Sequence, residues 1–252
     1  ALSIGGAVLT LKLFAGVTTL ALAALVGRLA AARGVSPLRA AAFVGLNPLV
    51  LVHVVGGAHN DGAAMLCAML GVGATLAAEE LGGGAAFVAA IGIKASVGFA
   101  APFALIGARR RGRFLLGAAA ALVLLALLAW PAFGFHWLNA VGVAERNLDR
   151  TSHMSFPSQI AAMTGLNRDL ARQGALYIYA CFVIFLLAWT WKGGDWVRAA
   201  GWAGLGLLLA TTWLLPWYLI WALPLAALSR DRTLRLLVLA VTAIQLGTRL
   251  PH

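Results

Sequence analysis

Long apolar runs with almost no charged side chain recur along the whole chain, and they restrict the folds it can adopt. Of the 252 residues, 62% are hydrophobic and only 11% are charged, whereas an average soluble domain has about 25% charged residues. So few charges cannot cover a water-facing surface, which excludes a soluble enzyme. Because apolar runs of this length suit membrane helices, we predict an all-α polytopic integral membrane protein.

The runs predict about eight transmembrane helices within a single transmembrane domain, residues 1–252. About 20 apolar residues cross the bilayer core. The predicted spans are Leu9–Leu29, Leu38–Val55, Ala63–Ala78, Leu115–Trp130, Leu176–Trp191, Ala199–Leu215, Trp217–Leu228 and Leu234–Leu246. A further stretch, Ala85–Ile106, is equally apolar but contains Lys94 near its middle.

Four basic clusters lie between these runs and predict which helix ends face the cytoplasm, because Lys and Arg concentrate in cytoplasmic loops. They are Arg28, Arg33 and Arg39; Arg109, Arg110, Arg111 and Arg113; Lys192 and Arg198; and Arg230, Arg232 and Arg235. Since this basic excess flanks membrane segments, it suits anionic lipid headgroups. The net charge of +11 therefore indicates a membrane partner and no nucleic acid.

A single crossing by Ala85–Ile106 would place Arg109–Arg113 outside, in conflict with the other clusters. The conflict disappears if residues 85–108 form a re-entrant helical hairpin that rises to about Lys94 and descends past Pro102. Each arm then has about ten residues, too few to span the bilayer. Such broken segments are tolerated where they line a cavity or are buried in protein, so we expect Lys94 at the tip to face a polar cavity.

The same count of crossings places three segments outside the membrane: His59–Asp61, the loop 132–175 and the turn Pro216–Tyr218. The loop 132–175 is the only long polar connection, and long loops often carry function. Cys67 and Cys181 lie inside apolar segments, so they indicate no disulfide framework.

His59, Asn60 and Asp61 place an imidazole, an amide and a carboxylate side by side at the outer end of two predicted spans. Asp61 is a candidate base or metal ligand, and His59 is a candidate ligand of a phosphate or sugar hydroxyl. The alternative is that Asn60 or Asp61 only caps the following helix.

Lys94 is a cation within a membrane segment, which by default indicates function. Its expected partner is Asp61, if the hairpin tip meets the outer ends of the spans, or a phosphate headgroup. The alternative is a snorkelling side chain or a structural ion pair.

The external loop supplies a second set of candidates. Arg146 and Arg150 are four residues apart, on one face of any helix there, and could grip a lipid phosphate. A solvated amphipathic helix accounts for them equally well. His153 and Ser155 belong to a polar run, Thr151–Gln159, that could order over a ligand.

Four aromatic residues, Trp213, Trp217, Tyr218 and Trp221, lie close together in the sequence. An interfacial belt is the favoured interpretation; the alternative is that the rings stack on a sugar or line an isoprenoid groove. No P-loop, dinucleotide fingerprint, zinc spacing or nucleophile elbow is present in the sequence. Acidic residues are too few for a dedicated metal cage, and the sequence leaves open whether a divalent ion takes part in the reaction.

Several motifs resemble those of the actinobacterial polyprenol-phosphomannose-dependent α-1,6-mannosyltransferases, a family within the multi-spanning GT-C superfamily. The first runs from Asn47-Pro48-Leu49-Val50-Leu51 to Gly57-Ala58-His59-Asn60-Asp61. The others follow in order: Lys94-Ala95 with Pro102-Phe103, Ser155-Phe156-Pro157-Ser158, and Pro216-Trp217-Tyr218-Leu219 with Trp221-Ala222-Leu223-Pro224. The first motif is fairly specific, and the others are weak alone.

The resemblance implies an inverting transfer of mannose from a polyprenyl-phosphate-mannose donor to a growing mannan or glycolipid, on the outer face of the plasma membrane. A lipid-phosphate donor agrees with the lack of a nucleotide site. The superfamily's catalytic carboxylate usually lies in the first external loop, and we expect this chain to begin after that loop. The resemblance therefore assigns that carboxylate to no residue here, makes Asp61 a secondary acid or substrate ligand, and predicts an inactive chain if it is complete.

The sequence thus predicts part of a membrane mannosyltransferase that acts on a lipid-linked sugar and a glycan acceptor. Asp61 and His59 are the catalytic candidates. The substrate-binding candidates are Asn60, Lys94, Arg146, Arg150, His153, Ser155, Trp217 and Tyr218. The rival function is a transporter or flippase for a lipid-linked sugar or small polar solute, since a broken helix with an intramembrane cation suits it equally well. A non-catalytic membrane scaffold is the third alternative.

Overall fold

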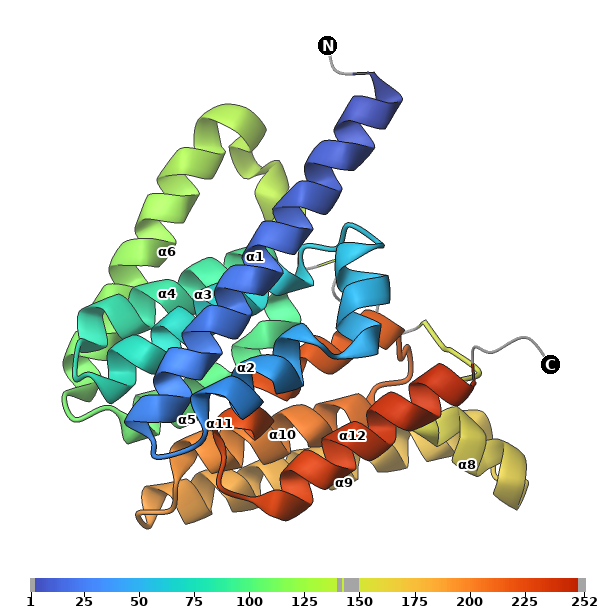
Figure 1. The fold of residues 1–252 in the computed structure, drawn as a ribbon. Coiled ribbons are helices and arrows are strands. Elements are labelled where there is room, and N and C mark those ends of the chain that lie inside the picture. Colours follow the sequence, from blue (N-terminus) through green and yellow to red (C-terminus); the bar gives the residue numbers. More distant parts are fainter. Residues whose placement is uncertain (1–2, 140–141, 143–149, 249–252) are drawn as a thin grey trace.

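The computed structural model describes residues 3–139, 142 and 150–248, and within them the chain forms helices and no strand (Figure 1). This confirms the all-α prediction. The α-helices are α1 (Ile4–Ala32), α2 (Pro37–Gly45), α3 (Asp61–Leu76), α4 (Glu80–Ile93), α5 (Ala101–Gly107), α6 (Arg111–Phe133), α8 (Phe156–Thr164), α9 (Arg168–Trp191), α10 (Trp196–Ala210), α11 (Leu223–Leu228) and α12 (Arg232–Gly247). Four shorter segments complete the fold: the π-helix η1 (Val50–Val55) and the 3₁₀ helices η2 (Ala95–Ala100), η3 (Gly134–Asn139) and η4 (Pro216–Trp221).

Three helices in the described part of the chain are long and apolar enough to cross a membrane. They are Ile4–Ala32, Arg111–His136 (α6 with part of η3) and Arg168–Trp191. Their outer surfaces carry many exposed leucine, isoleucine and phenylalanine side chains, as lipid-facing helices do. The remaining apolar helices have only 10–17 residues, so the predicted number of eight spans stays a prediction.

The apolar stretch around Lys94 forms the predicted hairpin. Helix α4 ends at Ile93, Lys94 takes an extended conformation (φ −155°, ψ 110°), and η2 and α5 lead back. The return is closed by a 3.3 Å hydrogen bond from the backbone N–H of Arg110 to Glu80 Oε1. The first arm begins at Glu80 rather than Ala85, because the buried Glu80 side chain is part of the closure.

Two predicted spans are broken in the structure. Leu38–Val55 is divided into α2 and η1, because Pro48 interrupts the helix and Asn47 Oδ1 accepts the Leu49 N–H at 3.0 Å. Trp217–Leu228 is divided into η4 and α11, so the second half of the chain also contains a broken apolar segment. The prediction of a single continuous span is therefore wrong for both segments.

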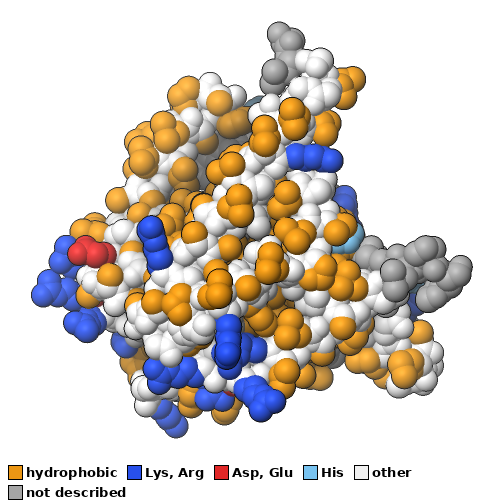
Figure 2. All heavy atoms as spheres, in the orientation of Figure 1, with side chains coloured by type: hydrophobic (Ala, Val, Ile, Leu, Met, Phe, Trp, Pro, Cys, Tyr) orange, Lys and Arg blue, Asp and Glu red, His pale blue; other side chains and the backbone are white. Residues whose placement is uncertain are grey.

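The four basic clusters meet on one face of the molecule, which we call the basic face. The Arg33 side chain forms an ion pair with Asp195. The carbonyl oxygen of Arg33 accepts two N–H groups of the Arg230 guanidinium, and this contact joins the first and fourth clusters. Arg198 pairs with Asp231 at 2.7 Å, and Arg111 lies 4.2 Å from the Trp191 ring centroid. Figure 2 shows basic side chains along the lower and left edges of the view. The contacts confirm that these clusters lie on the same side of the molecule.

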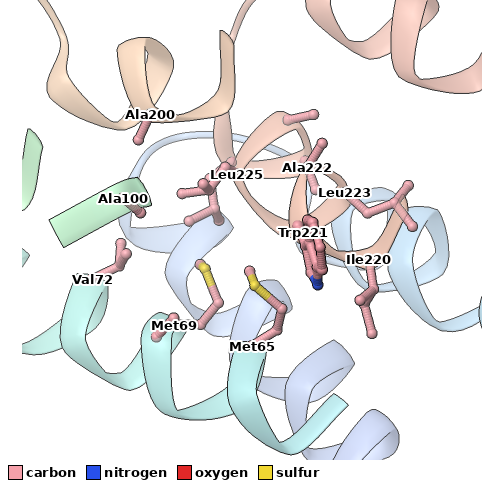
Figure 3. Close-up of a cluster of buried hydrophobic side chains, with 14 of the residues drawn as sticks. Met65, Met69, Val72, Ala100, Ala200, Ile220, Trp221, Ala222, Leu223 and Leu225 are labelled. Carbon is pink, nitrogen blue, oxygen red and sulfur yellow. The ribbon is translucent and has the colours of Figure 1, made fainter. Parts of the chain in front are cut away.

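One hydrophobic core contains residues from α1 to α12. Met65, Met69 and Val72 of α3 lie near Ala100, Ile220 and Leu225 in this core (Figure 3). Helix α6 packs closely on α4 at Gly117, where an added Cβ would lie 2.0 Å from the Leu81 carbonyl oxygen. The core therefore connects the hairpin of the first half with the broken segment of the second.

The predicted loop 132–175 is shorter in the structure and contains a helix. Helix α9 already begins at Arg168, where Asn167 Oδ1 accepts the N–H groups of Asp169 and Leu170. Helix α8 lies within the connection, capped by Ser155. The amide cap extends α9 by about two turns beyond its apolar run, since a capping residue satisfies the first helical N–H groups.

Candidate functional site

Asp61 is the centre of the candidate site. It is the first residue of α3, and its side chain is 0% exposed. Its Oδ1 accepts the indole N–H of Trp221 at 2.9 Å and lies 2.7 Å from Lys94 Nζ. The preceding Asn60 forms no side-chain cap bond. Helix capping is therefore not the role of the Asp61 carboxylate, which binds a cation and an indole from distant segments.

Lys94 meets Asp61 because the break in the hairpin ends beside the start of α3. Its Nζ also lies 2.8 Å from Asp61 Oδ2, so the ion pair predicted from the sequence is confirmed. The Lys94 side chain is 22% exposed. Snorkelling is excluded, since the ammonium is held on a buried carboxylate instead of reaching the membrane surface.

Aromatic rings of η4 complete the surroundings of the pair. Lys94 Nζ lies 5.0 Å from the Tyr218 centroid and 5.5 Å from that of Trp221, within the range of cation–π attraction. Tyr218 stacks on Trp221 with centroids 4.0 Å apart. The favoured belt interpretation is wrong for Trp221, because its indole is only 3% exposed and binds Asp61. We did not predict Trp221 as a site residue.

His59 lies at the edge of the site, in the loop between η1 and α3. Its imidazole stacks on Trp217 with centroids 3.8 Å apart. Gly57 makes room for the ring, since an added Cβ would lie 2.9 Å from His59 Cδ2. Burial lowers the pKa of His59; Asp61 acts in the opposite direction and Lys94 adds to the lowering. The imidazole is therefore neutral at pH 7 and can accept a hydrogen bond.

The site lies level with the middle of α1. A Cβ added to Gly62 would lie 3.0 Å from Thr19 Oγ1, which fixes the height of the start of α3 along α1. From Thr19 back to Ile4, α1 rises about 22 Å further. The Asp61–Lys94 pair therefore lies at the start of α3, below the N-terminal end of α1, and that end of α1 projects beyond α3 in Figure 1.

Among the described residues, the candidates from the long connection form no hydrogen bond or ion pair with Asp61 or Lys94. Arg150 lies over the Trp213 ring at 4.6 Å, and its carbonyl accepts the Thr212 hydroxyl at 3.0 Å. It also acts electrostatically on Tyr218, which places it near the rim of the site.

Two further candidates belong to the start of α8. The His153 side chain is exposed, and its carbonyl accepts Gln159 Nε2 at 2.6 Å. The Ser155 side chain is buried and caps α8. Arg146 lies outside the described residues, as do Glu145 and Asp149. Among the residues that the structure describes, no group of three His, Cys, Asp or Glu side chains could hold a metal ion.

Two family models match the two parts of the chain that form the site. One, described as "Alpha-(1->6)-mannopyranosyltransferase, N-terminal domain", matches residues 2–110, and the other, "MptB C-terminal domain", matches residues 154–252. His59, Asp61 and Lys94 lie in the first region, and Trp217 and Trp221 in the second.

Two proteins of Mycobacterium tuberculosis (strain ATCC 25618 / H37Rv) are similar to the chain. Alpha-(1->6)-mannopyranosyltransferase A is 28% identical over 211 residues, 72% of this chain and 40% of the relative. Alpha-(1->6)-mannopyranosyltransferase Rv1459c is 34% identical over 143 residues, 49% of this chain and 23% of the relative. The matched region thus spans less than half the length of each relative. No solved structure gives a significant match.

Proposed function

Because the chain belongs to the Alpha-(1->6)-mannopyranosyltransferase family, we propose that it forms part of a membrane glycosyltransferase that moves mannose from polyprenyl-phosphate-mannose to a mannan or glycolipid acceptor. The reaction takes place on the outer face of the plasma membrane. The observation that carries the proposal is the position of the Lys94 ammonium, which the buried Asp61 carboxylate and two aromatic rings hold at the end of a broken helix.

In this transfer an acceptor hydroxyl oxygen attacks the anomeric carbon of mannose, and the bond from that carbon to the phosphate oxygen breaks. The phosphate leaves with the bonding electron pair and gains negative charge, while the hydroxyl loses its proton. A site for this chemistry needs a cation near the phosphate and a hydrogen-bond acceptor near the hydroxyl.

Lys94 is the candidate for the phosphate. The ammonium has three N–H bonds and binds Asp61 while part of its side chain stays exposed. Asp61 fixes its position, as a positioning residue that is itself buried. Arg150, beside Trp213 and within electrostatic reach of Tyr218, is the candidate for a second phosphate contact.

His59 is the candidate for the acceptor hydroxyl. It is partly exposed and neutral at pH 7, whereas Asp61 is fully buried between Lys94 and Trp221. Trp217 lies flat against the His59 imidazole, with ring centroids 3.8 Å apart, and so fixes the orientation of that ring.

The test is mannosyl transfer from labelled polyprenyl-phosphate-mannose to a short mannan acceptor, in membranes that contain the protein. Lys94→Met and Asp61→Asn should each lower transfer by about a hundredfold, the typical loss when a charge-stabilising group is removed. The matched controls are Lys12→Met and Asp169→Asn, which change exposed side chains on α1 and α9. Transfer at the control rate by either site variant, at equal protein level, would refute the proposal.

A second candidate function, a transporter or flippase for a lipid-linked sugar, is favoured by one observation. The second half of the chain also contains a broken apolar segment, Pro216–Leu228, and transporters often pair broken segments from two halves. Movement of labelled polyprenyl-phosphate-mannose across the membrane of vesicles that contain the protein, without any mannosyl transfer, would support this function over the first.

A further inference from the structure

A cavity of about 470 Å³ opens on the basic face, between α2, α12 and the turns that precede them. Four arginines line it: Arg39 from α2, Arg230 from the turn after α11, and Arg232 and Arg235 from α12. It is separate from the Asp61–Lys94 site, since α1 runs about 20 Å from the level of Thr19 to its end at Ala32, next to the turn that lines the cavity.

The cavity has an uncompensated positive charge. Its lining contains no Asp or Glu, and among the described residues no carboxylate forms an ion pair with any of the four arginines. The nearby acids are engaged elsewhere: Asp195 pairs with Arg33, and Asp231 pairs with Arg198. Several guanidinium groups around one space with no counter-charge bind phosphate well, because a guanidinium group with unused N–H donors can form two parallel hydrogen bonds to it.

One arginine is held in place by the backbone. Arg230 donates from Nε and Nη2 to the carbonyl oxygen of Arg33, at 3.2 and 2.9 Å. The next residue, Gly34, has φ +68°, and a Cβ there would lie 2.5 Å from Arg230 Nη2. The glycine therefore allows this turn to close over the guanidinium, and the position of Arg230 is set before any ligand arrives.

The other wall of the cavity is apolar. Leu236 and Leu239 are 53% and 44% exposed, and Phe43 lies opposite them on α2. Arg232, Arg235, Leu236 and Leu239 follow helical spacing, so α12 presents arginines in its first turn and leucines in the next on one face. A ligand that fits this surface has an anionic head and a hydrocarbon tail.

We propose that this cavity binds the phosphate headgroup of an anionic membrane phospholipid, with Arg39, Arg230, Arg232 and Arg235 on the phosphate and an acyl chain along Leu236 and Leu239. Basic cavities between membrane helices, on the side where basic loops gather, suit such headgroups. The site is independent of mannosyl transfer and of the donor.

Lipid-dependent thermal stability of the purified protein tests the proposal, because a ligand that binds only the folded state raises Tm. The protein is held in neutral detergent with phosphatidylcholine, and phosphatidylglycerol is added in steps. A parallel arm adds inorganic phosphate. The pocket variant is Arg39→Gln/Arg235→Gln. The control is Arg109→Gln/Arg113→Gln, which removes the same charge from exposed positions elsewhere on the basic face.

We expect phosphatidylglycerol to raise the Tm of the unaltered protein and of the control, and the pocket variant to need at least tenfold more lipid for half of the rise. An equal loss in both double variants would overturn the proposal in favour of general surface charge. An equal rise with inorganic phosphate would overturn the assignment to a lipid. If the double variant unfolds, Arg39→Gln alone gives the same comparison, because this exposed arginine forms no ion pair among the described residues.

Discussion

Asp61 and Trp221 are 160 positions apart in the chain, and the indole N–H of Trp221 donates a 2.9 Å hydrogen bond to the buried Asp61 carboxylate. This contact joins the start of α3 to the broken segment η4. Lys94 binds the same carboxylate from the tip of the hairpin. Three segments that the sequence separates therefore converge on one acidic side chain.

Trp221→Phe tests the importance of this contact for stability. Phenylalanine keeps a ring against Tyr218 and Lys94 but removes the donor, so a buried carboxylate oxygen loses a partner. Hydrogen bonds to charged groups contribute about 1.5–3 kcal/mol, and we expect a loss of unfolding free energy in that range. Thermal unfolding in detergent measures it. Trp130→Phe, at a 50% exposed position, is the control; an equal Tm for both variants would contradict the prediction.

Much of this arrangement could be predicted from the sequence because charges in membrane segments follow strict rules. The conflict between a single crossing and Arg109–Arg113 required a hairpin, and the Arg110–Glu80 hydrogen bond closes it. The cost of an unpaired cation in an apolar segment likewise indicated a carboxylate partner for Lys94, and Asp61 provides it.

The remainder depended on tertiary contacts that no local pattern records. In the sequence, Trp221 looks like any aromatic residue at a membrane interface. Its role follows only from the tertiary packing that brings its indole N–H to Asp61. Mean hydropathy does not register the breaks in Leu38–Val55 and Trp217–Leu228, although each segment contains a proline, Pro48 or Pro224. Asn47 illustrates the cause, since its side chain binds both the Leu49 N–H and the Thr242 hydroxyl and holds the chain in a non-helical conformation.

Two glycines of α6 give a matched test of the packing that supports the hairpin. At Gly117 an added Cβ would lie 2.0 Å from the Leu81 carbonyl oxygen, whereas at Gly112 nothing lies within 4 Å. Gly117→Ala should separate α6 from α4 and cost about 1–3 kcal/mol. Gly112→Ala should be neutral or stabilise by up to about 1 kcal/mol, because alanine favours helix. Unfolding midpoints of the two variants decide; a smaller Tm loss for Gly117→Ala than for Gly112→Ala would refute the packing argument.

The Arg198–Asp231 pair on the basic face predicts a stability change in acid. Burial raises the pKa of Asp231, but hydrogen bonds from Leu234, Trp202 and Arg198 and the charge of Arg198 outweigh it, so the pKa lies below its ordinary value of 3.8. A lowered pKa stabilises the folded state above the ordinary value, and this contribution is lost as the pH falls through the lowered one. The Tm of Asp231→Asn should therefore depend less on pH below about 4 than that of the unaltered protein. Parallel Tm curves for the two would contradict this.

His59 predicts how mannosyl transfer depends on pH, if the proposed function is correct. Burial lowers the pKa of His59 below its ordinary 6.5, so the imidazole stays neutral down to that pH and becomes charged only in more acidic solution. A neutral imidazole accepts a hydrogen bond from the acceptor hydroxyl, and a charged one does not. The kcat/KM of transfer should thus be constant from about pH 7 to 8 and fall about tenfold per pH unit below the lowered pKa. His59→Asn should transfer slowly throughout and lack this acidic limb, while His136→Asn, at an exposed position, should keep it. An unchanged limb in His59→Asn would assign the titration to another group and leave His59 as a stacking partner of Trp217.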